Sequence, residues 1–170
     1  MSILTRKLRP DEIELHRDLR LRALSDSPDS FGEAFAEAAE RPATYWEDLT
    51  RSVTEPGGHV MFVALEGDNP IGSAYGLRDQ ERDHGGRVGG MWVRPESRRL
   101  GVGIALLQAI MDWARACALT RLALWAPDQN LGAMALYRRA GFRETENRRS
   151  LPTNETVRVV EMNFDISSAA

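Results

Sequence analysis

The pattern of hydrophobic and polar residues predicts a chain in which strands and helices alternate. Apolar residues recur at helical spacing between Ile104 and Ala118, which predicts a long amphipathic helix. Val160, Met162 and Phe164 alternate with polar residues instead, as expected of a strand with one buried face. Strands are predicted at about 3–8, 59–65, 71–77, 87–93, 121–126, from 142 and at 157–164, and helices at about 11–24, 31–40, 43–52, 104–118 and 130–140. This order predicts a mixed sheet of the α/β or α+β class.

Cap-forming and turn-forming residues predict where several of these elements begin and end. Asp11 is the predicted N-cap of the first helix, and Asn130 is that of the last. Gly141 fits the C-terminal cap of the last helix, because glycine accepts the left-handed backbone found there. Gly89 and Gly90 are unusual inside a strand, so they predict a bulge or a close approach of another backbone.

The length and composition are those of one globular domain. The 170 residues leave room for a single domain, expected at 1–166, with a frayed tail at 167–170. Apolar residues make up 42% of the chain, and no apolar run approaches the roughly 18 residues of a membrane span. The first ten residues lack the apolar stretch of a secretory signal. We therefore expect a cytoplasmic protein that does not bind a membrane.

Charge and cysteine content argue against further classes of protein. The net charge of −3 argues against a nucleic-acid binder, which usually carries a basic excess. Cys117 is the only cysteine, so an internal disulfide and a four-cysteine zinc site are excluded. Because it falls in the predicted long helix, Cys117 is expected to be a buried packing residue. Asp11, His16 and His59 are too scattered to predict a metal site.

The loop at 93–104 joins a predicted strand to the N-terminus of the long helix. Such an N-terminus presents unpaired N–H groups and the positive end of the helix dipole, so it binds phosphate anions. Gly101 and Gly103 would let a phosphate approach the backbone, and Arg98 and Arg99 add positive charge. The predicted ligand is a pyrophosphate or a similar anion.

Two common nucleotide motifs do not fit this loop, but a third pattern does. Leu106 stands where the dinucleotide fingerprint needs its third glycine, and no lysine completes a P-loop. Arg98-x-x-Gly101-x-Gly103 instead resembles the acetyl-CoA signature, R/Q-x-x-G-x-G/A, of the GNAT family of N-acetyltransferases. A second block at 130–142 resembles the pattern N-x-x-A-x-x-x-Y-x-x-x-G-F of the same family.

The resemblance covers about 3–165 and is strongest at 87–146, and the segment 21–31 also resembles the acceptor-side helix and loop of many bacterial members. It implies a single GNAT-like domain whose mixed central sheet, flanked by helices, is splayed open between the fourth and fifth strands. It also implies an enzyme that uses acetyl-CoA as co-substrate and no metal. In that reaction a primary amine attacks the thioester directly.

The resemblance also implies roles for individual residues. Backbone atoms of Met91 and Val93 would hold the pantetheine arm like an added strand, and an N–H near Met91 would face the acetyl oxygen. Tyr137 is the candidate general acid for the departing thiolate, or else an aromatic residue packed on a buried helix face. Asn130 fits both a helix cap and a cofactor contact. The expected cofactor-binding residues are Met91, Trp92, Val93, Arg98, Arg99, Leu100, Gly101, Val102, Gly103, Ile104, Asn130 and Tyr137.

The general base is not assigned by these patterns. Many relatives carry a glutamate on the splayed strand, where this chain has Gly89 and Gly90. Asp83, His84, Asp128 and a water relay are the alternatives for the group that accepts the proton. His84 also fits an ordinary solvated loop residue.

The acceptor amine is also left open. Glu33, Glu37 and Glu40 share one face of a predicted helix, where they would attract a cationic amine or form an ordinary solvated face. Three aromatic residues fit either an acceptor pocket or the core: Phe31, Trp46 and Trp92. The alternatives for the acceptor are a small amine, such as an amino acid, polyamine or drug, and a protein N-terminus. A non-catalytic acyl-CoA-binding sensor and a homodimer are further alternatives.

Overall fold

The computed structural model describes residues 2–167. Its strands are β1 (Ile3–Lys7), β2 (Val60–Glu66), β3 (Asn69–Arg78), β4 (Gly85–Val93), β5 (Arg121–Pro127), β6 (Arg143–Leu151) and β7 (Asn154–Asp165). Its α-helices are α1 (Ile13–Asp26), α2 (Phe35–Ala39), α3 (Ala43–Thr54), α4 (Val102–Ala116) and α5 (Leu131–Arg139). Two short 3-10 turns, η1 (Pro28–Ser30) and η2 (Pro95–Ser97), complete the elements of this part of the chain.

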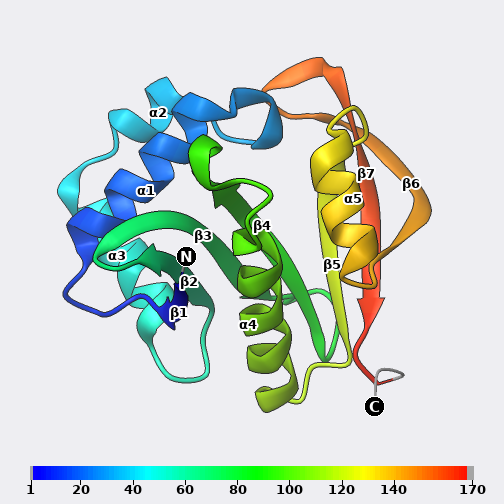
Figure 1. The fold of residues 1–170 in the computed structure, drawn as a ribbon, viewed down its shortest axis with the longest axis horizontal. Coiled ribbons are helices and arrows are strands. Elements are labelled where there is room, and N and C mark those ends of the chain that lie inside the picture. The colour runs from blue at the N-terminus through cyan, green and yellow to red at the C-terminus, as the bar shows by residue number, and fades with distance from the viewer. Residues whose placement is uncertain (1, 168–170) are drawn as a thin grey trace.

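Within these residues the strands form one mixed sheet in the order β1-β2-β3-β4-β5-β7-β6. Neighbouring strands run antiparallel except β4 and β5, which are parallel. Parallel neighbours need a crossover connection, and α4 is that crossover, since it leads from the end of β4 back to the start of β5 (Figure 1). The predicted mixed sheet flanked by helices is confirmed.

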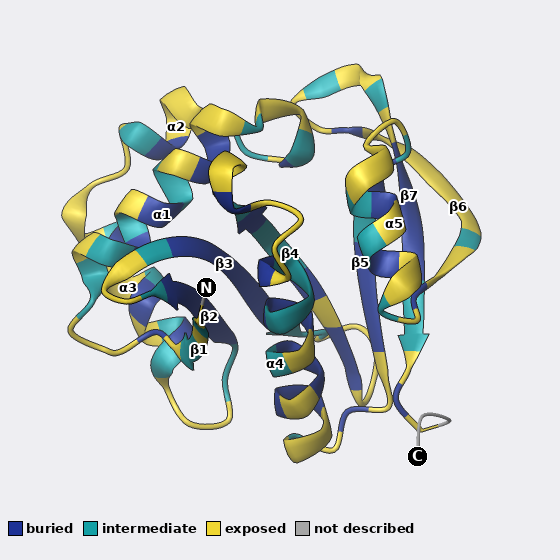
Figure 2. Ribbon diagram, in the orientation of Figure 1, coloured by how far each residue is buried: buried dark blue, intermediate teal, exposed yellow. Residues whose placement is uncertain are grey.

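Helices cover both faces of the sheet. On one face α4 packs across β1 to β4, and α5 lies beside β5, so that both helices share one hydrophobic core with the sheet. On the other face α1 and α3 contact β2 to β4 and enclose a second core. Figure 2 shows buried residues along the central strands and exposed residues on the outer faces of the helices. No helix within residues 2–167 is long and apolar enough to cross a membrane.

The sheet opens between β4 and β5. The two strands pair only from Gly85 to Arg87 on β4 and from Arg121 to Ala123 on β5. Beyond these residues they diverge, so that the two halves of the sheet spread apart toward the end where α5 begins (Figure 1). The predicted opening between the fourth and fifth strands is confirmed.

The first helix begins later than predicted, and Asp11 is not its N-cap. The cap position belongs to Glu12, and the helix starts at Ile13. The Glu12 carboxylate accepts hydrogen bonds from the Arg9 N–H at 2.9 Å and from the Arg6 guanidinium at 2.6 Å. These bonds hold the turn between β1 and α1, which delays the start of the helix.

The predicted helix at 31–40 is much shorter, because its first residues are held by other contacts. The carbonyl oxygen of Phe31 accepts a hydrogen bond from Thr153, and Glu33 accepts one from Arg20. Only Phe35–Ala39 is helical. Glu33 therefore precedes the helix and Glu40 caps its end, so the predicted helical face formed by Glu33, Glu37 and Glu40 is wrong.

Two expectations about the ends of elements also change. Cys117 lies just after the end of α4, partly buried against the core, and not in the middle of the helix. In the predicted tail at 167–170, the Ser167 N–H donates to Asp165 Oδ1 at 3.0 Å, which places Ser167 in a turn. Residues 168–170 lie outside the described residues.

Candidate active site

A cleft of about 640 Å³ lies where β4 and β5 diverge. Its walls are formed by 88–93 of β4, by 124–127 of β5, by the start of α4 and by α5. The predicted cofactor-binding residues that line it are Met91, Trp92, Val93, Arg98, Arg99, Gly101, Gly103, Ile104, Asn130 and Tyr137. Leu100 and Val102 do not line the cleft, because Leu100 is exposed to solvent and Val102 is buried in the core. The opening of the sheet gathers the other predicted residues around one cavity.

The β4 side of the cleft presents a strand edge that has no partner strand. Pairing with β5 ends at Arg87. Between Gly89 and Trp92, β4 carries one residue more than the segment of β3 opposite it, which is a β-bulge. Gly90 lies in this bulge with a φ of 54°. The predicted bulge is confirmed, and it sits in the part of β4 that lines the cleft.

Tyr75 packs directly against the bulge. A Cβ atom at Gly90 would overlap the Tyr75 ring, so only glycine fits there without movement. The Tyr75 hydroxyl lies 2.6 Å from His16 Nε2, and His16 Nδ1 lies 2.9 Å from Thr50 Oγ1. Burial, with a smaller contribution from the charge of Arg20, lowers the pKa of His16 to about 4, so its ring is neutral at pH 7. This buried network supports the bulge from inside the molecule.

The N-terminus of α4 lies at the edge of the cleft. The helix begins after Gly101, which has a φ of 91°, and no described side chain caps this end. The N–H groups of the first turn are therefore free to bind an anion. Arg99 precedes the turn with a φ of 62° and forms no ion pair with any described residue. A Cβ atom at Gly103 would lie 2.8 Å from Leu136 Cδ2 of α5, so the end of that side chain would have to shift to make room for it.

Arg98 is held by protein groups and does not project freely into the cleft. Its Nε donates to the Val93 carbonyl oxygen at 2.9 Å, and its Nη2 donates to Asp26 Oδ2. Asp26 also accepts a 2.9 Å hydrogen bond from Trp92 Nε1. Desolvation opposes ionisation of Asp26, but hydrogen bonds from Ser27, Trp92 and Arg98 outweigh it and hold its pKa below the usual value. Arg98 thus ties the end of α1 to β4.

Comparison with family models matches residues 20–142 to the acetyltransferase (GNAT) family. The matched segment contains β4, the loop before α4 and α5, and therefore most of the cleft. The chain belongs to the GNAT family. The predicted resemblance is confirmed, and so is the predicted enzyme class, an N-acetyltransferase.

Individual GNAT proteins extend this comparison over the whole fold. The aminoglycoside N(6')-acetyltransferase type 1 of Stenotrophomonas maltophilia is 30% identical over 106 residues, which are 59% of this chain and 69% of that protein. A GNAT acetyltransferase of Streptococcus pneumoniae has a TM-score of 0.81 at 20% identity, covering 96% of this chain and 99% of that one. An acetyltransferase of Salmonella typhimurium, solved with its cofactor acetyl-CoA, has a TM-score of 0.76 at 16% identity, covering 98% and 95%. At these identities the solved structures establish a shared fold.

Tyr137 belongs to the hydrophobic core and also lines the GNAT cleft. Its ring centroid lies 6.1 Å from that of Phe142, and the residue also lines the cleft, so the two predicted alternatives are compatible. Burial raises the pKa of Tyr137 to about 12, so the phenol is protonated at neutral pH. Asn130 also has two positions in the structure that match its two predicted roles. As the N-cap of α5 its Oδ1 accepts a 3.1 Å hydrogen bond from the Ala133 N–H, and the residue also lines the cleft.

No residue in the described lining of the GNAT cleft is an aspartate, a glutamate or a histidine. Asp83 and His84 are exposed and precede β4, at the end of the sheet where β4 and β5 are paired. Asp128 follows Pro127, a lining residue, and its Oδ1 is buried without a hydrogen-bond partner among the described residues. The same part of the chain contains no group of three or more side chains arranged to hold a metal ion.

The aromatic candidates for the acceptor pocket separate into two groups. Phe31 and Trp92 line the cleft. Trp46 is fully buried instead, and its ring meets the His16 ring edge-on at 6.0 Å between centroids. Trp46 therefore belongs to the core beneath the bulge and not to an acceptor pocket.

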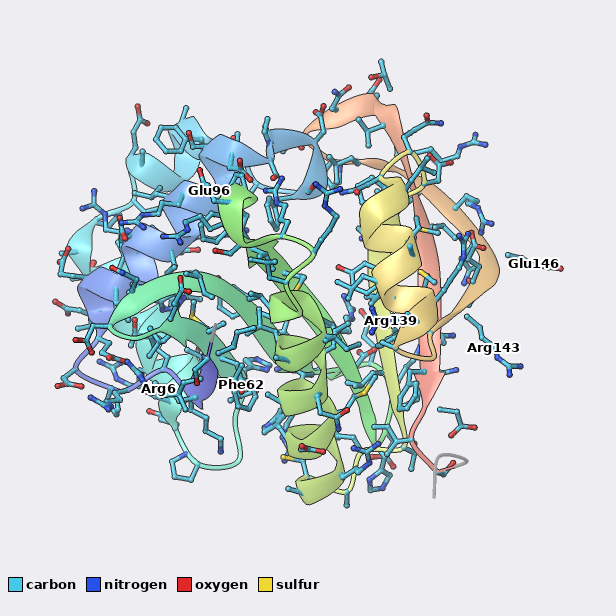
Figure 3. All side chains as sticks on the ribbon, viewed as in Figure 1. Arg6, Phe62, Glu96, Arg139, Arg143 and Glu146 are labelled. Carbon is cyan, nitrogen blue, oxygen red and sulfur yellow. The ribbon has the colours of Figure 1, made fainter. Side chains whose placement is uncertain are left out.

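Sequence reasoning missed Trp125, Arg139 and the segment 27–30 as lining residues. For Trp125 a signal was present, because the family resemblance implies an opening between the fourth and fifth strands and Trp125 lies on the predicted fifth strand. Arg139 lies inside the second family block, and Figure 3 shows it at the end of α5 on the side toward α4. Ser27 and Ser30 fall in the segment 21–31, which resembles the acceptor-side helix and loop of the family, but that resemblance did not single out these two residues.

Proposed function

We propose that the protein transfers an acetyl group from acetyl-CoA to a primary amine. The observation that carries this proposal is the cleft itself, which joins an unpaired strand edge, an uncapped helix N-terminus and a buried phenol. Pantetheine is an extended chain with two amides, so it fits beside β4 as an added strand. Its pyrophosphate fits the first turn of α4, where free N–H groups and Arg99 meet.

The bulge in β4 is the expected position of the acetyl carbonyl. A bulge turns the backbone groups next to it away from the regular ladder, and here the support from Tyr75 fixes that turn. In this proposal the Met91 N–H donates to the acetyl oxygen and stabilises the negative charge that forms there during attack. Gly89 and Gly90 leave space for the amine to approach the carbonyl carbon.

The proposed reaction needs one acid and a neutral amine. The amine nitrogen forms a bond to the acetyl carbon, the carbon–sulfur bond breaks, and the sulfur leaves with the bonding electrons as a thiolate. Tyr137 donates its proton to that thiolate, the surplus proton on nitrogen passes to solvent, and the phenolate of Tyr137 takes a proton back from solvent. A phenol with a raised pKa stays protonated until charge reaches sulfur, and the same dry surroundings raise the proton affinity of the thiolate.

One observation favours a second function. Because no described lining residue is an aspartate, a glutamate or a histidine, the cleft itself offers no strong base. A protein that binds acyl-CoA as a sensor without turnover needs none. The two functions differ in whether thiol is released when an amine is added.

The test combines binding and turnover in the full chain. Acetyl-CoA should raise the melting temperature, because it binds only the folded state. Thiol release should then appear with some members of an amine panel that includes aminoglycosides, amino acids, polyamines and peptides with free N-termini. A melting shift without thiol release from any amine would support the sensor, and the absence of a shift would contradict acetyl-CoA binding.

A further inference from the structure

The face of β5, β7 and β6 that lies opposite α5 carries a second group of side chains next to the cleft. On β7, Val160 and Met162 are buried in the core shared with α5, so Val159 and Glu161 belong to the opposite face. Glu161 pairs with Trp125 of β5, and Trp125 lines the cleft. Glu161 and Trp125 therefore lie side by side on one face of the sheet, and Trp125 connects this face to the cleft.

Glu161 is a buried carboxylate with incomplete partners. Only 6% of its side chain is exposed. Its Oε2 accepts a 2.5 Å hydrogen bond from Asn147 Nδ2. Its Oε1 lies 3.6 Å from Arg82 Nη1, which is longer than a hydrogen bond. A buried carboxylate is stabilised when both oxygens have close charged or hydrogen-bonding partners, and an ammonium group of a ligand would complete the set.

Arg149 lies over the same tryptophan. Its Cζ atom is 4.1 Å from the centre of the Trp125 ring, and no carboxylate among residues 2–167 lies within ion-pair distance of it. Arg98 on the other side of the cleft is, by contrast, already paired with Asp26. A guanidinium group that rests over a ring without a carboxylate partner keeps N–H groups for a ligand, and a carboxylate can accept two parallel hydrogen bonds from them.

Two segments far apart in the sequence meet beside this region. Thr153 Oγ1 donates to the Phe31 carbonyl oxygen at 2.9 Å, and Asn154 Nδ2 donates to Asp29 Oδ1 at 3.1 Å. Figure 1 shows the β6–β7 hairpin reaching the segment that follows α1. Because Phe31 also lines the cleft, these two hydrogen bonds tie the β6–β7 hairpin to the wall of the cleft.

We infer that the acceptor is a small amine that also carries a carboxylate, as a free amino acid does. Glu161 binds the ammonium form of the amine, which gives up a proton to solvent before it attacks the thioester, and Arg149 binds the carboxylate. Arg149 pairs with Val159, two residues from Glu161. Such diagonal positions lie about 7–8 Å apart, so two long side chains from them can reach both charged groups of one small molecule. The inference rests on the proposed function, because it names the acceptor of that reaction.

The first experiment compares amino acids with their carboxamides, which keep the amine and lose the negative charge. Thiol release from acetyl-CoA is measured with the full chain for each pair, and 1,4-diaminobutane serves as an amine with a second positive charge. We expect kcat/KM for the free acid to exceed that for its amide by about 10- to 100-fold, the range for one charge-assisted contact.

Variants of Arg149 and Glu161 test which side chain causes the preference for the free acid over its amide. Arg149→Gln should abolish the preference for the acid without changing KM for acetyl-CoA, and Arg149→Glu should favour 1,4-diaminobutane instead. Arg148→Gln is the matched control, since Arg148 pairs with Val160 and so belongs to the opposite face. Glu161→Gln should raise KM for acids and amides alike, whereas Glu155→Gln, at an exposed position of the same strand, should not.

The outcomes separate this inference from the proposed function. Equal kcat/KM values for acids and amides, or equal effects of Arg149→Gln and Arg148→Gln, would overturn the charged acceptor and leave acetyl transfer standing. Thiol release with none of the amines would overturn the transfer activity and the inference with it. If Glu161→Gln lacks a melting transition, the acid–amide comparison in the unmodified protein and in the Arg149 variants decides.

Discussion

On the β4 side of the cleft most of the groups available to a ligand belong to the backbone, at the bulge around Gly90 and in the first turn of α4, and the Arg99 guanidinium adds to them. On the β5 side Trp125 lines the cleft, and the side chains of Glu161 and Arg149 lie beside it on the same face of the sheet. Backbone groups depend on main-chain geometry, which glycine and close packing fix. Side chains can be exchanged while the strands beneath them stay in place. The β4 side therefore suits acetyl-CoA, the ligand that the proposed reaction uses with any acceptor, and the β5 side suits the acceptor itself.

Gly90→Ala gives the largest expected effect, because it changes the backbone side directly. The new Cβ atom would meet the Tyr75 ring at a positive φ. Left-handed strain costs about 1–2 kcal/mol and overpacking about 1–3 kcal/mol, so unfolding free energy should fall by about 2–5 kcal/mol. Denaturant titration measures the fall, and thiol release from acetyl-CoA should fall with it.

Gly67→Ala is the matched control for this prediction. Gly67 has a φ of 58°, close to that of Gly90, but a Cβ atom there would have no neighbour within 4 Å. Only the backbone strain of about 1–2 kcal/mol should remain. Equal losses in the two variants would mean that contact with Tyr75 does not hold the bulge.

Tyr137→Phe tests the one side chain from α5 that the proposed reaction uses. The ring and its packing against Phe142 remain, but the proton donor is lost. Single-turnover acetyl transfer should slow by roughly 100-fold, with little change in the affinity for acetyl-CoA. Tyr45→Phe, which removes a hydroxyl outside the cleft, should change neither quantity. A weaker affinity with an unchanged rate would make Tyr137 a binding residue.

The backbone side of the cleft could be predicted from the sequence, and the side-chain side could not. Arg98, Gly101 and Gly103 lie within six consecutive positions, so their arrangement depends on local structure and not on long-range contacts. Glu161 and Trp125 are far apart in the sequence and meet only through the antiparallel register of β5 and β7. No local pattern fixes that register. The mixed sheet was predictable from the order of strands and helices along the chain. Its opening was predictable from the resemblance to the family.

Local reasoning also failed where long-range contacts override it. Glu33 has helical spacing to Glu37, but its pairing with Arg20 keeps it outside α2. The sequence predicts one shared role for Arg98 and Arg99, because the two residues are adjacent. Only the structure separates them, since Asp26 reaches Arg98 from the end of α1.

The buried His16 network gives the backbone side a pH dependence. The pKa of His16 is about 4 in the folded protein, below the ordinary value of 6.5, so below pH 6.5 the unfolded chain binds more protons than the folded one. Stability should therefore fall as the pH drops from about 6.5 toward 4, by about 2 kcal/mol at pH 5. Urea titrations at pH 7, 6 and 5 measure this slope. His16→Gln should flatten it and His84→Gln, at an exposed position, should not; an unchanged slope in His16→Gln would contradict the assignment.

The smallest expected effect separates the two adjacent arginines by comparing acetyl-CoA with acetyl-pantetheine, which lacks the pyrophosphate and the nucleotide. Arg99 has no ion pair among the described residues, so Arg99→Gln should weaken acetyl-CoA by roughly tenfold and leave acetyl-pantetheine unchanged. Arg98 holds the Val93 carbonyl and Asp26, so Arg98→Gln should loosen β4 and weaken both ligands by a similar factor. Equilibrium titration of each variant with each ligand measures the four ratios. If Arg99→Gln lowers the affinity for both ligands equally, Arg99 does not bind phosphate. If Arg98→Gln lowers only the affinity for acetyl-CoA, the Arg98 guanidinium leaves Asp26 and binds the phosphate when the ligand is present.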